Sequence, residues 1–156
     1  MSDPLSVAAS IAGLISLAGQ LYTVIDNFTT SIKDAPSLAR TVRAEIYSCR
    51  HSLLAIQKLL SGPAFSPRRA ALIPADHVVV SFTEAVLLFS ELEATVRPLT
   101  NAAVTTFVTR ARWARREGRL TTLISRLQWH KNTLVLQLNI LQWYVCSSGC
   151  PSSIYL

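Results

Sequence analysis

Residues 4–25 form a stretch of 22 residues without a charged side chain, in a chain that carries a net charge of +6. Pro4 suits the first turn of a helix, and apolar residues then recur on nearly every face of that helix as far as Phe28. A helix that is apolar all round is either buried in a bundle or inserted in a membrane. The fold must therefore shield this stretch from water.

The length of this stretch would permit a membrane span, because a bilayer core takes about 20 apolar residues in a helix. Its composition argues against a permanent span, since no basic residue flanks it before Lys33 and five polar residues interrupt it: Ser6, Ser10, Ser16, Gln20 and Thr23. The small residues Ala9 and Gly13, four apart, would let another helix approach closely in water or in lipid. Three alternatives stay open: a core helix, a core helix that can also insert into a membrane, and a permanent span.

The rest of the chain also shows helical spacing, in segments bounded by proline and glycine. These segments are residues 36–60, 76–98, 106–117 and 119–142, and Pro98 is expected to end the second of them. The clearest pattern is a series of apolar residues at seven-residue intervals, as in a packed helical seam: Trp113, Leu120, Leu127, Leu134 and Leu141. We expect an all-α fold, an antiparallel bundle of four or five helices.

The cysteines and the start of the chain predict a protein inside the cell. The chain of 156 residues is one domain's worth, half of it hydrophobic and only 15% charged, which excludes a disordered or low-complexity protein. Asp3 precedes the apolar stretch where a secretory signal would need a basic residue. Without such a signal, the odd number of cysteines predicts reduced thiols: Cys49, Cys146 and Cys150.

The sequence carries no motif for catalysis or for metal or cofactor binding. It has no glycine-rich phosphate loop, no G-x-S-x-G elbow and no H-E-x-x-H pair. Its histidines fall in different helical segments and do not cluster with Cys146 and Cys150 as zinc ligands would: His51, His77 and His130. We expect a protein that is not an enzyme and uses no metal or cofactor.

The excess of positive charge lies in one segment. Residues 110–131 contain seven basic residues and the single acid Glu117, so this segment accounts for the whole net charge. Four of its arginines are candidates for one face that contacts anionic lipid or an acidic partner: Arg112, Arg115, Arg116 and Arg119. Binding of nucleic acid is the disfavoured alternative, because Trp113 belongs to the apolar seam rather than to a base-stacking surface.

Four stretches of the sequence resemble one protein family. They are "MSDPLSVAASIAGLISLAGQLY", "DAPSLARTVRAEIYSCRHSLLAIQKLL", "RRAALIPADHVVVSFTEAVLLFSELE" and "SRLQWHKNTLVLQLNIL". Together they are similar to the fungal N-terminal domain of STAND proteins, a HeLo-like domain also named after the N-terminal region of protein L of the azaphilone pigment biosynthesis cluster. The resemblance covers residues 1–141 and implies a HeLo-like bundle at the head of an NLR-like receptor.

The resemblance also implies a function, although it brings no catalytic residue with it. Related domains act in programmed cell death and heterokaryon incompatibility, where self-association frees an N-terminal helix that permeabilises the plasma membrane. The protein would then be a cytoplasmic signalling module, recruited to that membrane and paired with a downstream or separate nucleotide-binding receptor. Five residues would mark the inserting helix: Leu5, Ala9, Gly13, Leu17 and Leu21. The alternative is a passive adaptor or oligomerisation domain without membrane activity.

The last residues depart from the family pattern. Residues 142–156 lack both charge and helical periodicity, and they contain several turn formers. We expect an unstructured tail, which is either natural or the product of truncation or intron read-through.

Overall fold

The computed structural model describes residues 4–32, 35–62, 75–100 and 106–147; within these ranges, the side chains of 4–8, 75–79, 106, 141 and 144–147 are not described. The five helices are α1 (Pro4–Ser31), α2 (Ser37–Leu60), α4 (Ala75–Thr100), α5 (Thr106–Arg115) and α6 (Glu117–Ser147). These ranges contain no strand, so the prediction of an all-α bundle is confirmed.

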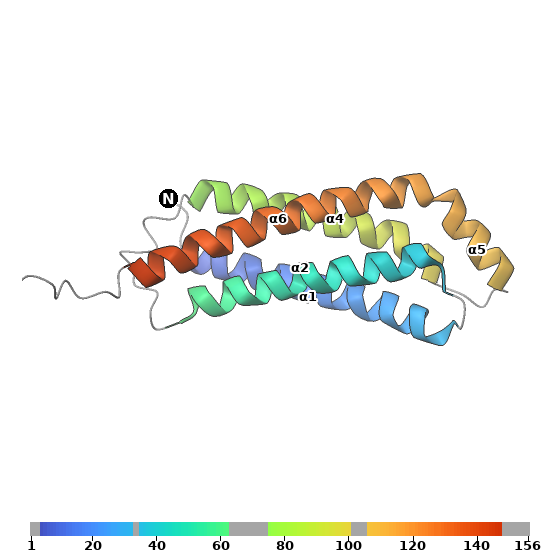
Figure 1. Ribbon diagram of the computed structural model, residues 1–156, viewed down its shortest axis with the longest axis horizontal. Helices are drawn as coiled ribbons and strands as arrows, with labels where there is room; N and C mark the ends of the chain where they lie inside the picture. Colours follow the sequence, from blue (N-terminus) through green and yellow to red (C-terminus); the bar gives the residue numbers. More distant parts are fainter. Residues whose placement is uncertain (1–3, 33–34, 63–74, 101–105, 148–156) are drawn as a thin grey trace, which may run out of the picture.

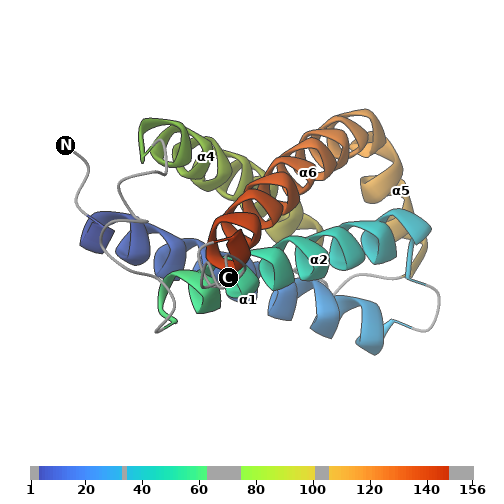
Figure 2. The same cartoon turned by 60° about the vertical axis from the view of Figure 1, so that its left-hand side comes forward.

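The four long helices lie along one axis. The colours of Figure 1 run from left to right along α1 and α4 and from right to left along α2 and α6. Helix α1 packs against α2 and α4, and α6 packs against the same two helices, as Figure 2 shows from another side. The short helix α5 lies across one end of this bundle (Figure 1). All five helices contribute side chains to a single hydrophobic core.

Helix α1 is buried along one side only. The buried residues recur every three or four positions and are each at most 4% exposed: Ile11, Leu14, Ala18, Leu21, Ile25 and Phe28. The opposite side faces solvent with small or polar residues, which we call the α1 outer face: Ala9, Ala12, Gly13, Ser16, Gln20 and Thr23. The apolar stretch is therefore shielded without being enclosed on every side.

The predicted seam runs from α5 into α6. Trp113, Leu120, Leu127 and Leu134 are at most 2% exposed, which confirms the seam over these four positions; the side chain of Leu141 is outside the description. The chain bends at Arg116, whose N–H donates to the carbonyl oxygen of Trp113 at 3.0 Å. Leu120 N–H in turn donates to the Arg116 carbonyl oxygen at 2.9 Å, so backbone bonding continues through the bend.

Two predicted helix ends were wrong. Helix α4 continues through Pro98 to Thr100. Proline lacks the N–H that would bond the carbonyl oxygen of Ala94, and only two helical residues follow it. Helix α6 extends to Ser147, so the first residues of the expected tail, from Gln142 onward, belong to the helix. The remaining tail residues, 148–156, lie outside the described ranges.

Candidate functional site

The residues predicted for the inserting helix do not share one face of α1. Ala9 and Gly13 are exposed, Leu17 is half-buried against the core and Leu21 is buried; the side chain of Leu5 is outside the description. The physical reason is helical geometry, because each step of four residues turns about 40° beyond a full circle. A series spaced by four therefore winds from the outer face into the core.

Gly13 would allow close approach of another helix, but none of the described helices packs against it in the bundle. A Cβ added at Gly13 would meet no atom of another helix within 4 Å. The segment Ala9–Ser31 has a mean hydropathy of 1.3 and is long and apolar enough to cross a membrane. The core helix of a soluble protein can be equally long and apolar, so length and hydropathy alone do not distinguish a core helix from a membrane helix.

Apolar burial, rather than ion pairing, holds α1 in the bundle. Arg43 on α2 contacts Asp26 at 2.9 Å and donates a second hydrogen bond to Thr29 Oγ1 at 3.3 Å. Both charged side chains are more than one-third exposed, and exposed ion pairs contribute about 0–1 kcal/mol. A buried leucine or isoleucine, by contrast, contributes about 1.5–3 kcal/mol.

The predicted arginines gather where α5 covers the end of the bundle. We call Arg112, Arg115, Arg116 and Arg119 with their surroundings the arginine end; all four side chains are exposed. Arg119 contacts Glu91 on α4 at 3.3 Å, and Glu91 also binds Arg126 at 2.9 Å. Within the described part of the chain, the other three side chains form no hydrogen bond or ion pair, so their charge faces solvent.

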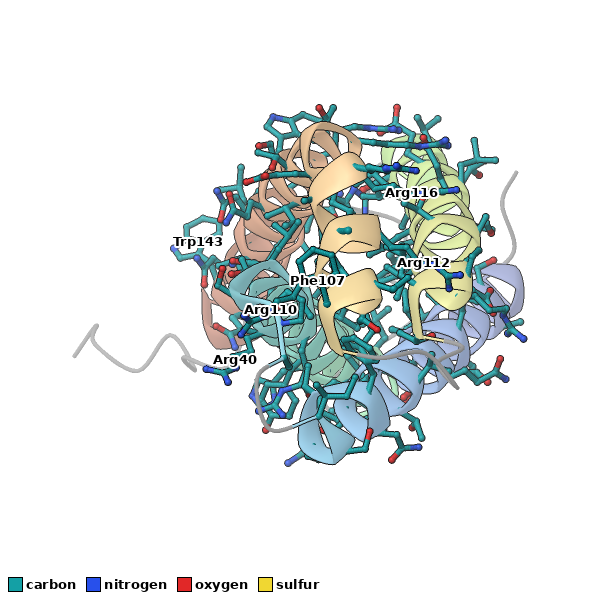
Figure 3. The ribbon with its side chains drawn as sticks, turned by 90° about the vertical axis from the view of Figure 1, so that its right-hand side faces the viewer. Arg40, Phe107, Arg110, Arg112, Arg116 and Trp143 are labelled. Atoms are coloured by element: carbon teal, nitrogen blue, oxygen red, sulfur yellow. The ribbon has the colours of Figure 1, made fainter. Side chains whose placement is uncertain are left out.

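Sequence reasoning missed two exposed residues at this end. Arg40, from the first turns of α2, lies with Arg110 on one side of α5, while Arg112 and Arg116 lie on the other (Figure 3). Phe107 is 81% exposed at the start of α5. Its position was detectable, because six residues before Trp113 places it on a different face of the helix from the seam.

The α1 outer face and the arginine end lie apart. Phe28, near the end of α1, stacks on Trp113 of α5 with ring centroids 5.5 Å apart. Pro4 precedes Phe28 by 24 residues, which is about 36 Å along a helix. The structure therefore does not bring the predicted inserting residues from Leu5 to Gly13 together with the arginines.

One polar cluster joins α2 to α6. Lys131 Nζ contacts Glu45 Oε2 at 2.7 Å, and Gln128 Nε2 donates to Glu45 Oε1 at 2.9 Å. Burial alone raises the pKa of Glu45, but these hydrogen bonds and the lysine charge outweigh it, and the net pKa is lowered. Burial raises the pKa of the nearby Cys49 thiol to about 12, so this thiol stays protonated and is not a nucleophile at neutral pH.

His130 lies in the core between α6 and its neighbours. It is 3% exposed, and within the described ranges its Nε2 has no hydrogen-bond partner. Burial lowers its pKa below the ordinary value of 6.5, although the charge of Glu84 acts in the opposite direction. The folded protein therefore favours the neutral imidazole, and protonation favours unfolding.

We predict that the bundle loses stability as the pH falls below about 6.5. Above the pKa of His130 in the unfolded chain, this residue does not reduce the free energy of unfolding. Below that pKa, protonation of the unfolded chain lowers the free energy of unfolding by up to about 1.4 kcal/mol per pH unit. Urea denaturation between neutral pH and pH 5 would measure this slope. His130→Leu should abolish the slope in this window, whereas His51→Gln on the exposed surface should retain it. Equal slopes in wild type and His130→Leu would contradict the prediction.

The described residues contain no group of three or more histidine, cysteine or acidic side chains that could hold a metal ion. Comparison with protein-family profiles, with curated proteins and with solved structures found no match. The placement of α1 and of the arginines is therefore what bears on function.

Proposed function

We propose that the protein is a signalling module that self-associates and acts on anionic membranes through α1, in partnership with a nucleotide-binding receptor. One observation carries the proposal: α1 is charge-free from Pro4 to Ile25, on its outer face as well as on its buried side. Such a helix can leave the core for lipid without desolvating a charge. The family resemblance supports the same function, in fungal NLR-like signalling and cell death.

Release of α1 requires a trigger. The six buried side chains of α1 contribute on the order of 10 kcal/mol. That is comparable to the whole stability of a typical domain, about 5–15 kcal/mol. In a membrane the same side chains again avoid water, so lipid can compensate for the lost core contacts. Self-association at a membrane surface would both trigger the release of α1 and place it next to the lipid that it enters.

The arginine end would provide the membrane contact. The side chains of Arg112, Arg115 and Arg116 are exposed, and α5, which carries two of them, lies at one end of the bundle (Figure 1). Basic residues near an anionic leaflet contribute about 1 kcal/mol each. The exposed Phe107, at the start of α5, adds an apolar side chain that can enter the headgroup region.

A passive adaptor is the second candidate function. The observation that favours it is the complete burial of one side of α1, which ties the helix to α2 and α4. In that case α1 never leaves the core, and the arginine end docks an acidic protein instead of lipid.

Dye release from vesicles distinguishes the two functions. Wild-type protein, artificially multimerised if necessary, is expected to release dye from vesicles that contain phosphatidylserine. Gly13→Asp adds a charge to the outer face, which costs about 2.5–3.5 kcal/mol at the centre of a membrane helix, so leakage should fall about a hundredfold. Ala44→Asp is the matched control, because it adds the same charge to the exposed face of α2.

A second arm of this experiment tests the arginine end. Changing Arg112, Arg115 and Arg116 together to glutamine should weaken binding to the same vesicles by roughly a hundredfold, and high salt should do likewise. Circular dichroism must show that every variant is folded. Multimerised wild-type protein that neither binds nor permeabilises the vesicles would leave the adaptor as the better explanation.

A further inference from the structure

The second half of α6 is apolar on two opposite sides. Its inner side carries the buried seam residues Leu127 and Leu134. Its outer side carries large apolar residues that are about half to two-thirds exposed: Trp129 (63%), Leu136 (60%), Ile140 (47%) and Trp143 (65%). Beyond Lys131 the helix contains no charged residue. A bundle of this size needs only the inner side.

The outer residues form one straight line along the helix, which we call the α6 outer stripe. Together with Thr133, they alternate in steps of four and three: Trp129, Thr133, Leu136, Ile140 and Trp143. Alternating four-three spacing is the pattern by which one helix packs along another in a coiled coil. The stripe is about 21 Å long, and Figure 3 shows Trp143 pointing away from the bundle.

We propose that the α6 outer stripe binds the same stripe of a second copy of this chain, in parallel and about a two-fold axis. In this arrangement each large residue meets its own counterpart, so Leu136 contacts Leu136 of the partner subunit and the tryptophans contact one another likewise. Self-pairing of this kind would bring like charges together if the stripe carried any. The stripe contains no charged residue, so no such repulsion arises. The proposal deepens the proposed function, because it names the surface used for self-association.

The exposed area suffices for such a pair. The four large side chains expose roughly 500 Å² on each chain. Pairing would therefore bury about 1,000 Å² in total before the flanking polar residues are included, which is the area at which specific interfaces begin. Tryptophans are also the residues that contribute most to binding energy when they are buried in an interface.

A second copy fits the stripe better than a lipid surface does. Interfacial helices attract anionic lipid through basic residues beside their apolar face. The nearest basic residues are instead paired within the bundle: Lys131 Nζ contacts Glu45 at 2.7 Å, and Arg126, three residues before Trp129, contacts Glu91 at 2.9 Å. Parallel pairing also places the two arginine ends at the same end of the dimer, where both can reach one membrane.

Sedimentation velocity of the full chain, without membranes, tests the proposal. Wild-type protein should be a dimer with a dissociation constant in the micromolar range. Leu136→Asp places two carboxylates against each other and should weaken the dimer by at least about a hundredfold. Leu87→Asp on α4 is the matched control, because Leu87 is a leucine of nearly equal exposure, 63%. It should leave the dimer intact.

Cross-linking tests the direction of the helices. Thr133→Cys, in a chain whose three native cysteines are replaced by alanine, should form a disulfide-linked dimer on oxidation, and Leu87→Cys in the same background should not. A monomeric wild type, equal effects of Leu136→Asp and Leu87→Asp, or no cross-link through Thr133→Cys would overturn the proposal. The proposal would also be wrong if wild-type protein bound vesicles as a monomer and Leu136→Asp abolished that binding, because the stripe would then bind lipid. The dimerisation experiments need no membrane. Their outcome is therefore independent of the vesicle leakage experiment, so failure of this proposal can be told from failure of the proposed function.

Discussion

Leu14→Asp should unfold the bundle, whereas Gly13→Asp at the adjacent position should leave it folded. Leu14 is fully buried, and an unpaired carboxylate in its place would cost more than about 4 kcal/mol, most of the stability of a typical domain. Gly13 is exposed, and its Cβ position is open. Because glycine is also a poor helix former, aspartate there costs little in water. Far-UV circular dichroism and urea denaturation would measure both variants.

The comparison decides how a membrane assay can be interpreted. A Leu14→Asp variant that fails to permeabilise vesicles has lost its fold as well as any insertion, whereas Gly13→Asp separates the two properties. Leu14→Ala serves as the control for lost packing without charge, with an expected cost of 2–5 kcal/mol. If Gly13→Asp proved as unstable as Leu14→Asp, the α1 outer face would have to be packed in solution.

Trp113→Ala should lower the free energy of unfolding by about 3–5 kcal/mol. Trp113 is the largest of the fully buried side chains, and its ring stacks on Phe28, so it joins α5 to the end of α1. Its loss would open a cavity under the arginine end. Urea denaturation measures the effect, and loss of amide protection in α5 would show that this helix detaches.

Phe107→Ala is the matched control for this prediction. It also removes an aromatic ring from α5, but the ring is 81% exposed, so the expected cost is below about 0.5 kcal/mol. Similar losses of stability for the two variants would show that Trp113 does not fasten α5 to the bundle.

The sequence predicted the helices and the seam because both depend on local periodicity. The seven-residue spacing from Trp113 to Leu134 identified buried residues without any knowledge of their partners. Periodicity was uninformative in α1, where nearly every position up to Ile25 is apolar or small, so the buried side could not be told from the outer face. In α6 the buried seam accounted for the helical spacing of apolar residues, so the α6 outer stripe was not recognised from the sequence.

Contacts between distant residues could not be predicted from the sequence. Glu91 pairs with Arg119 and Arg126 across two helices, and Glu45 pairs with Lys131, 86 residues further along the chain. These pairs depend on how the helices are arranged. The same arrangement places the arginines at the end of α1 opposite to its first turns.

With its arginines at one end, the elongated bundle has a positive pole. Near an anionic surface the field exerts a torque on such a molecule within about a Debye length, roughly 8 Å in physiological salt. The protein would therefore arrive upright, with the last turn of α1 nearest the lipid and its first turn farthest away. Because Asp26 lies close to the end of α1 nearest the lipid, the molecule would have to tip onto its side before the charge-free residues 4–25 could enter the bilayer.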